Sequence, residues 1–201
     1  MVFGVNMARY DDLSEYDWLM AEIIKHESDQ ARVLGHILMD KLSPKSVIDV
    51  GCGPGIYLLP FLERGAEVMG IDGAPRSGQS LPATEPFQIV DLRNPWFPPR
   101  RFDLALCIEV AEHLRPQYAG ILVDTVCRCA DVVFWTAARP DQGGEGHYNQ
   151  QTKDYWLDLF AGHGYGLSPR NEQVMAEVNR LPEFEHCKWV RWNGMLIERS
   201  K

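Results

Sequence analysis

The residues best suited to bind a ligand lie in the segment 47–55, which reads Val-Ile-Asp-Val-Gly-Cys-Gly-Pro-Gly. Its glycines, at 51, 53 and 55, permit a tight turn and let the backbone approach a ligand closely. A helix is predicted directly after them, and the first N–H groups of a helix have no internal partners. Because the glycines follow an apolar run that contains Asp49, the pattern predicts a ligand-binding turn between a buried strand and a helix.

The glycine spacing disfavours two common nucleotide-binding motifs. A dinucleotide-binding GxGxxG motif needs its third glycine at position 56, which is Ile56. A phosphate-binding P-loop needs a lysine followed by serine or threonine, which this segment lacks. The spacing is GxGxG, so a nicotinamide-dependent dehydrogenase is a poor alternative.

Acidic residues and a histidine follow other predicted strands. Asp72 ends the apolar segment 67–72, where a carboxylate can accept hydrogen bonds from both hydroxyls of a ribose. Asp91, Glu109 and His113 also come shortly after apolar runs. Open α/β sheets bind their ligands at the carboxyl ends of their parallel strands, so we expect these side chains to converge there.

The elements that must position these residues alternate along the chain. Strands are predicted at 46–50, 67–71, 87–90, 102–108 and 131–136. Helices are predicted within 1–45, at 56–64, from 116 and from 152, and loops at 73–86 and 138–151. The tail 187–197 is predicted as one more strand, with Asn193-Gly194 as a bulge or tight turn. This alternation predicts an open, mostly parallel α/β sheet.

The ordered set of motifs resembles the class I S-adenosylmethionine-dependent methyltransferases. The resemblance rests on Asp49–Gly55, on Gly65–Asp72, on Asp91-Leu92 and on Phe102–Leu114, and it extends over residues 45–165. It implies a Rossmann-like open, mostly parallel seven-stranded sheet with helices on both faces and an antiparallel C-terminal strand. Residues 46–201 would form the methyltransferase domain, and residues 1–45 an N-terminal helical cap segment of the same domain.

The resemblance implies S-adenosylmethionine as cofactor and S-adenosylhomocysteine as product. Asp72 would bind the ribose, Asp91 the adenine amino group, and Asp49 would orient the glycine loop and approach the amino group of the cofactor. The backbone of the glycine loop and of Ile108 would line the methionine end, with Glu109 beside it. The complete expected cofactor site is Asp49, Gly51, Cys52, Gly53, Gly55, Asp72, Gly73, Asp91, Leu92, Ile108 and Glu109.

Methyl transfer requires an aligned acceptor, exclusion of water and, for a hydroxyl acceptor, removal of a proton. His113 is the candidate base, with a rate that rises through the histidine pH range; a histidine that caps a helix or packs on a loop is the open alternative. His147 lies in the glycine-rich loop and is a candidate for substrate contact or for the base, or else a solvent-exposed residue. Tyr148 and Tyr16 complete the expected acceptor site, with Tyr16 either in a lid or in a core-packing stripe of the first helix.

Composition narrows the function further. The chain has 201 residues with 20 Lys and Arg against 28 Asp and Glu, a formal net charge of −8. This length fits one domain, and the acidic balance makes nucleic acid and anionic membranes unlikely partners. The start of the chain has no secretion-signal pattern, and no apolar run is long enough to span a bilayer.

Cysteine and histidine usage predicts neither disulfides nor metal. The five cysteines contain no CxxC pair, which favours reduced, buried thiols in a cytoplasmic protein. The six histidines show neither an HxxxH motif nor a cluster with carboxylates in the sequence, so no metal site is expected.

The sequence thus predicts a metal-independent methyltransferase that acts on a small-molecule or carbohydrate-like acceptor, with oxygen as the favoured atom. One alternative is a macromolecular acceptor: a protein, an RNA or the end of a polysaccharide. The other is a non-catalytic partner subunit that binds S-adenosylmethionine. The sequence does not define the oligomeric state.

Overall fold

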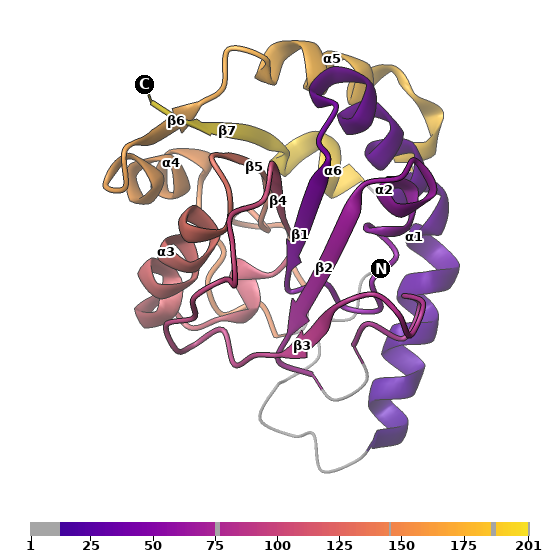
Figure 1. Cartoon of the computed structure of the whole chain (residues 1–201). Coiled ribbons are helices and arrows are strands. Elements are labelled where there is room, and N and C mark those ends of the chain that lie inside the picture. The colour runs from indigo at the N-terminus through magenta and orange to yellow at the C-terminus, as the bar shows by residue number, and fades with distance from the viewer. Residues whose placement is uncertain (1–12, 75–76, 145, 186–187, 201) are drawn as a thin grey trace.

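The computed structural model describes residues 13–74, 77–144, 146–185 and 188–200, and within them seven strands form one sheet (Figure 1). The strand order is β3-β2-β1-β4-β5-β7-β6, in which β1 to β5 pair in parallel and β7 is antiparallel to both β5 and β6. The bounds are β1 Ser46–Val50, β2 Glu67–Asp72, β3 Phe87–Ile89, β4 Leu104–Ile108, β5 Val132–Thr136, β6 Tyr165–Leu167 and β7 Met195–Arg199. This arrangement confirms the predicted fold class.

Helices cover both faces of the sheet, with α3 and α4 on one side and α1 and α2 on the other (Figure 1). The helices are α1 Leu13–Leu42, α2 Leu59–Glu63, α3 Ala119–Cys129, α4 Lys153–Ala161, α5 Asn171–Arg180 and α6 Lys188–Asn193. Short 3-10 turns occupy Ala111–His113, Pro116–Tyr118 and Pro182–Phe184. The central strands are buried on both faces because alternate residues, such as Leu104 and Ala105, enter different core clusters.

The first helix packs on the sheet through the apolar stripe that the sequence indicates. Leu34, Ile37 and Leu38 are buried, and α1 contacts both α2 and α5. Gly35 allows the close approach of α2, because a Cβ at Gly35 would lie 2.2 Å from Pro60 Cγ. Pro60 itself lies in the first turn of α2, where its missing N–H costs little.

The C-terminal region differs from the prediction. The strand predicted at 187–197 is wrong over most of its length, because Lys188–Asn193 forms α6 and the strand β7 begins only at Met195. A short run of mixed apolar and polar residues fits a helix and a strand equally well, so periodicity could not distinguish them here. The sequence interpretation also missed β6 and α5.

None of the helices in the described part of the chain is both long enough and apolar enough to cross a membrane.

Candidate functional site

The glycine loop after β1 depends on backbone conformations that favour glycine. Gly51, Gly53 and Gly55 have φ angles of +83°, +50° and +89°. The N–H groups of Gly51 and Cys52 donate to the carbonyl of Ile71, at 2.8 and 3.0 Å, which ties the loop to the end of β2. The ends of β1 and β2 lie at the same edge of the sheet (Figure 1).

The glycines have different neighbours. A Cβ at Gly51 would lie 2.5 Å from the side chain of Val110, and one at Gly55 would lie 2.8 Å from Leu81. A Cβ at Gly53 would meet no atom within 4 Å, so this part of the loop faces open space. Cys52 is buried, and burial raises the pKa of its thiol well above the usual value, so Cys52 is an uncharged packing residue.

Asp72 holds the glycine loop from the end of β2. Its Oδ2 accepts a hydrogen bond from Gly53 N–H at 2.9 Å, and its Oδ1 accepts one from Ala74 N–H at 2.9 Å. Burial raises the pKa of this carboxyl, and the two backbone donors oppose that rise. Each carboxylate oxygen can accept more than one hydrogen bond, so Asp72 keeps acceptor capacity for a ligand. Gly73 follows it at an exposed position.

Asp49 is buried beneath the loop, with only 2% of its surface exposed. Its Oδ1 has no hydrogen-bond partner among the described residues. Burial, followed by the negative charge of Asp72, raises the pKa of Asp49 to about 7. A buried carboxylate without a partner is costly unless it meets a cation or a hydrogen-bond donor. Asp49 therefore fits a ligand that carries an ammonium group.

Asp91, the residue expected to bind the adenine amino group, already has hydrogen-bond partners within the protein. Asp91 is exposed and accepts two hydrogen bonds from the Arg93 guanidinium, both at 2.8 Å, and one from Asn94 Nδ2 at 3.1 Å. The Arg93 hydrogen bonds lower the pKa of Asp91. Leu92 is buried in the core cluster that α3 covers. The structure thus places Asp91 in an ion pair rather than as a free acceptor.

Two glutamates follow β4, whose last residue Ile108 is buried: Glu109 is half-buried and Glu112 is fully buried. Glu109 has φ +52°, and its N–H donates to Thr136, which locks the turn to the end of β5. Its carboxylate accepts hydrogen bonds from Asn193 Nδ2 at 3.1 Å and from Gln142 Nε2 at 3.2 Å. Glu112 lies close enough to Glu109 for each carboxylate to affect the pKa of the other.

Burial raises the pKa of both glutamates, and that of Glu112 lies well above its usual value. Glu112 is fully buried and accepts a hydrogen bond from Ala138 N–H at 3.1 Å. The negative charge of Glu109 adds to the rise in the pKa of Glu112, because two like charges close together disfavour each other. The pair connects β4 to the loop after β5.

The two candidate histidines lie in contact. The rings of His113 and His147 meet edge to face, with centroids 4.8 Å apart. Burial, followed by the proximity of His147, lowers the pKa of His113 to about 4, and burial lowers that of His147. Both imidazoles are therefore neutral at pH 7 and able to accept a proton. Nδ1 of His147 lies 3.2 Å from Gln150 Nε2.

Glu112 joins these histidines in space. The ligand atoms of Glu112, His113 and His147 all lie within 4.8 Å of one another, close enough to hold a metal ion. The residues come from two segments more than 30 positions apart, so spacing in the sequence did not indicate this cluster.

Of the two tyrosines expected at the acceptor site, the structure describes the side chain of Tyr148 only. Tyr148 is 41% exposed, with the Arg115 guanidinium 5.5 Å from its ring, and its N–H donates to the carbonyl of Glu112. Tyr16 falls in the first turns of α1, whose side chains are outside the described part of the structure.

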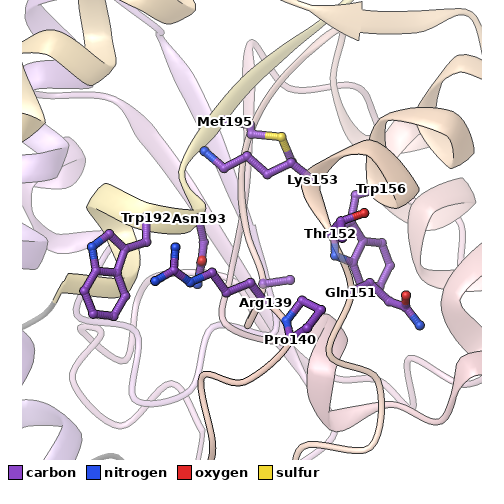
Figure 2. A pocket seen from close by; sticks show the side chains of 10 residues that line it. Arg139, Pro140, Gln151, Thr152, Lys153, Trp156, Trp192, Asn193 and Met195 are labelled. Carbon is purple, nitrogen blue, oxygen red and sulfur yellow. The ribbon is translucent and has the colours of Figure 1, made fainter.

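A cavity of about 350 Å³ lies next to this region, beyond the end of β5 (Figure 2). The residues that line it come from the loop after β5, the start of α4, the end of α6 and the start of β7: Ala137, Arg139, Pro140, Gln151, Thr152, Lys153, Trp156, Trp192, Asn193 and Met195. The sequence interpretation proposed none of them as site residues. The position of Arg139, shortly after a predicted strand, is a signal that could have found it.

Comparisons with known proteins agree with this architecture. Residues 25–179 match the family model of a methyltransferase domain. The chain is 32% identical to the ubiquinone biosynthesis O-methyltransferase of Azotobacter vinelandii, over 95% of this chain and 82% of that relative. Other enzymes of the same name match over shorter stretches: this chain spans about half the length of one (54%) and about a third of another (32%).

Solved structures share the fold. The O-methyltransferase family protein from Burkholderia thailandensis has a TM-score of 0.71 at 13% identity, covering 100% of this chain and 64% of that one. Magnesium protoporphyrin IX methyltransferase from Synechocystis PCC 6803, solved with bound S-adenosylmethionine, has a TM-score of 0.57 at 17% identity, covering 87% and 80%. At these identities the structures establish the fold alone. The family model and the Azotobacter relative, together with the fold, show that this chain belongs to the class I S-adenosylmethionine-dependent methyltransferases.

Proposed function

We propose that this protein transfers a methyl group from S-adenosylmethionine to a hydroxyl oxygen of a small molecule. The observation that carries the proposal is the glycine loop at the carboxyl edge of the sheet, with Gly53 facing open space and Asp49 holding a buried oxygen without a partner. An ammonium group is a suitable partner for that oxygen, and S-adenosylmethionine has one.

The residues around the loop fit the cofactor in chemical type. Asp72 would accept hydrogen bonds from the ribose, Asp49 would pair with the amino group, and the backbone at Gly51, Gly53 and Ile108 would line the methionine end. Asp91 contributes at the adenine only if its ion pair with Arg93 opens. When bound, the cofactor supplies a methyl group on a positively charged sulfur, which is already strongly electrophilic.

The residues after β4 would handle the acceptor proton. His113 is neutral above a pH of about 4, so it can take a proton from a hydroxyl that lies against it. Glu112, which accepts the Ala138 N–H, and Glu109, which accepts hydrogen bonds from Asn193 and Gln142, hold the turn that carries His113. His147 lies against the ring of His113, and together with Tyr148 it would contact the acceptor.

The relatives support the choice of acceptor. The relatives reported above are named as O-methyltransferases of ubiquinone biosynthesis, which favours oxygen as the methylated atom and a small molecule as the acceptor. The net charge of −8 disfavours a nucleic acid as the acceptor.

Four cysteines are buried and free, which supports a reducing, cytoplasmic compartment. The contacts of α1 with α2 and α5 support the described part of the predicted cap segment 1–45, residues 13–42, as part of the same domain.

Turnover against a panel of acceptors tests the proposal. The purified protein is incubated with S-adenosylmethionine and with phenols, catechols and sugars, and mass spectrometry follows S-adenosylhomocysteine and methylated product. We expect both to form in equal amounts with at least one hydroxyl acceptor. Asp72→Ala should weaken binding of S-adenosylmethionine by about 1–3 kcal/mol and slow both at low cofactor concentration. If the cofactor binds but no small-molecule acceptor is methylated, while a protein or RNA fraction is, the acceptor is macromolecular. If nothing is methylated, the chain is a non-catalytic partner subunit.

A further inference from the structure

The cavity beyond β5 carries two positive charges with no acidic partner. Arg139 and Lys153 both line it, and in the described part of the chain neither forms an ion pair. Other arginines of this acidic protein do pair with carboxylates, as Arg64 does with Asp40 and Arg128 does with Asp124.

The charges of Arg139 and Lys153 affect each other. The pKa of Lys153 is lowered by burial and then by the charge of Arg139, and no carboxylate offsets either effect. The ammonium of Lys153 donates to the carbonyl of Gly194 at 3.0 Å, which leaves two of its three donors available. An anion placed between these cations would relieve their repulsion.

A third donor lies in the same wall. Trp156 is 1% exposed, and its indole Nε1–H has no hydrogen-bond partner among the described residues. A buried N–H without a partner costs free energy unless a ligand or water accepts its hydrogen bond. The first turn of α4 also begins at the cavity, with Thr152 as its N-cap. Its free backbone N–H groups add a favourable field for an anion.

Most of the other lining residues are apolar, and two of them, Trp156 and Trp192, are flat aromatic side chains. Trp192 is 44% exposed, and the Arg139 guanidinium lies 4.5 Å from its ring centroid. Figure 2 shows Trp192 and Arg139 on one side of the cavity and Trp156 on the other, with Pro140 between them. Such a space suits an aromatic or otherwise flat body that carries a charged end.

A single side chain, that of Asn193, connects the cavity to the glutamate pair. Asn193 lines the cavity, and its Nδ2 donates to Glu109 Oε1 at 3.1 Å and to Gln142 Oε1 at 2.9 Å. We propose that Arg139 and Lys153 form an anion subsite for the methyl acceptor, which is a flat, apolar molecule bearing a carboxylate or phosphate group. This assignment rests on the proposed function, because it takes the ligand of the cavity to be the acceptor.

Binding of small aromatic anions tests the subsite without any turnover. The probes are benzoate and phenyl phosphate, with benzamide as the neutral match for benzoate, and binding is followed by tryptophan fluorescence and calorimetry on the whole chain. We expect one of the two anions to bind at least about tenfold more tightly than benzamide, with an affinity that falls as salt is added. The tighter of the two anions identifies the charged group as carboxylate or phosphate.

Variants locate the binding. Arg139→Gln and Lys153→Gln should each weaken anion binding by at least about tenfold, whereas Lys153→Arg should retain most of it. Arg180→Gln removes the same charge from an exposed position on α5 that does not line the cavity, and it should change nothing. The affinity for S-adenosylhomocysteine should be the same in every variant, which also shows that each is folded.

Equal binding of benzoate, phenyl phosphate and benzamide, or anion binding that survives both neutralising variants, would overturn the subsite. A failed proposed function gives a different pattern. In that case the anions still bind and respond to Arg139→Gln, but no acceptor with or without a charged group is methylated.

Discussion

At the scale of single residues, the site is defined by charge states that burial has shifted away from their ordinary values. Asp49 and Glu112 hold protons more tightly than exposed carboxyls do, and His113 holds its proton less tightly. All three shifts have burial as their largest cause and favour the uncharged form of the group. A ligand that brings an opposite charge can therefore change the protonation of this site on binding.

Asp49 should make cofactor binding depend on pH. Its pKa of about 7 means that it is mostly protonated at pH 6 and mostly ionised at pH 8 in the free protein. Only the ionised form attracts an ammonium group, so affinity for S-adenosylmethionine should rise with pH, by up to about tenfold per unit below the pKa and little above it. Calorimetry at pH 6, 7 and 8 measures this. Asp49→Asn should bind more weakly at every pH and lose the dependence, and a flat wild-type profile would contradict the assignment.

His113 should act on the rate and not on cofactor binding. A positioned base contributes about 10²–10⁴-fold, and a base whose pKa lies well below the working pH gives the lower end of that range, so His113→Gln should lower turnover by about 10²-fold and leave the affinity for S-adenosylhomocysteine unchanged. Because the pKa of His113 is about 4, the wild-type rate should be level between pH 6 and 8 and fall only toward pH 4. The unshifted histidine expected from sequence would instead give a rise near pH 6.5.

His147→Gln is the matched variant for that experiment. It should raise the KM for the acceptor more than it lowers kcat, because a binding contact acts on ground and transition states alike. Near-normal turnover in His113→Gln together with a large loss of kcat in His147→Gln would move the base to His147.

The cluster of Glu112, His113 and His147 requires a separate test of metal dependence. We expect the reaction to need no metal, because burial and the charge of Glu109 raise the pKa of Glu112 and so disfavour the ionised form that binds a cation, and because the methyl donor is already activated. Activity should therefore survive incubation with a chelator and subsequent dialysis. Loss of activity that is restored by one added divalent cation would place an ion in this cluster instead.

At the scale of elements, the turn between β1 and α2 combines two different demands for glycine. Gly51 is required because a side chain would collide with Val110, whereas Gly53 faces open space. The first requirement concerns the fold, and the second concerns the ligand. Substitutions at the two positions should therefore separate stability from binding.

Gly51→Ala should lower the free energy of unfolding by about 1–3 kcal/mol, because it adds strain at positive φ to an overlap with Val110. Gly53→Val should cost less stability but abolish cofactor binding, because its side chain fills the space in front of the loop. Chemical denaturation and calorimetry measure the two effects. Normal cofactor affinity in a folded Gly53→Val protein would show that the loop does not hold the cofactor.

Some of these elements can be predicted from the sequence and others cannot. The strands β1, β2, β4 and β5 are predictable because each is a short apolar run, almost wholly buried. The three-residue β6 has no such run, and α6 was taken for a strand because six residues are too few to show a helical period. The cavity could not be predicted because four distant segments form it, and their meeting depends on where β7 enters the sheet.

At the scale of the whole molecule, the first helix connects the core to the cofactor side of the sheet. Its C-terminal half packs on α2, while Met20 and Ile23 pack against Ala74, whose N–H binds Asp72. Glu27, farther along α1, is close enough to Glu109 to be affected by its charge, although burial is the main reason why its pKa is raised to about 7. The helix thus packs against the Asp72 side of the predicted site, and the charge of Glu109 on the other side affects Glu27.

Cofactor binding should therefore be transmitted to α1 through Ala74. We expect S-adenosylhomocysteine to slow amide hydrogen exchange in the glycine loop, at Ala74 and in the part of α1 around Met20, because ordering one side of this contact stabilises the other. Met20→Ala removes the contact and should abolish the protection of α1 while the glycine loop stays protected. Leu38→Ala provides the matched control, because Leu38 is buried in the same helix away from Ala74. That variant should lower the free energy of unfolding by about 2–5 kcal/mol and leave the ligand-dependent protection near Met20 intact. If protection near Met20 persists in Met20→Ala, the helix responds to the cofactor by another route than Ala74.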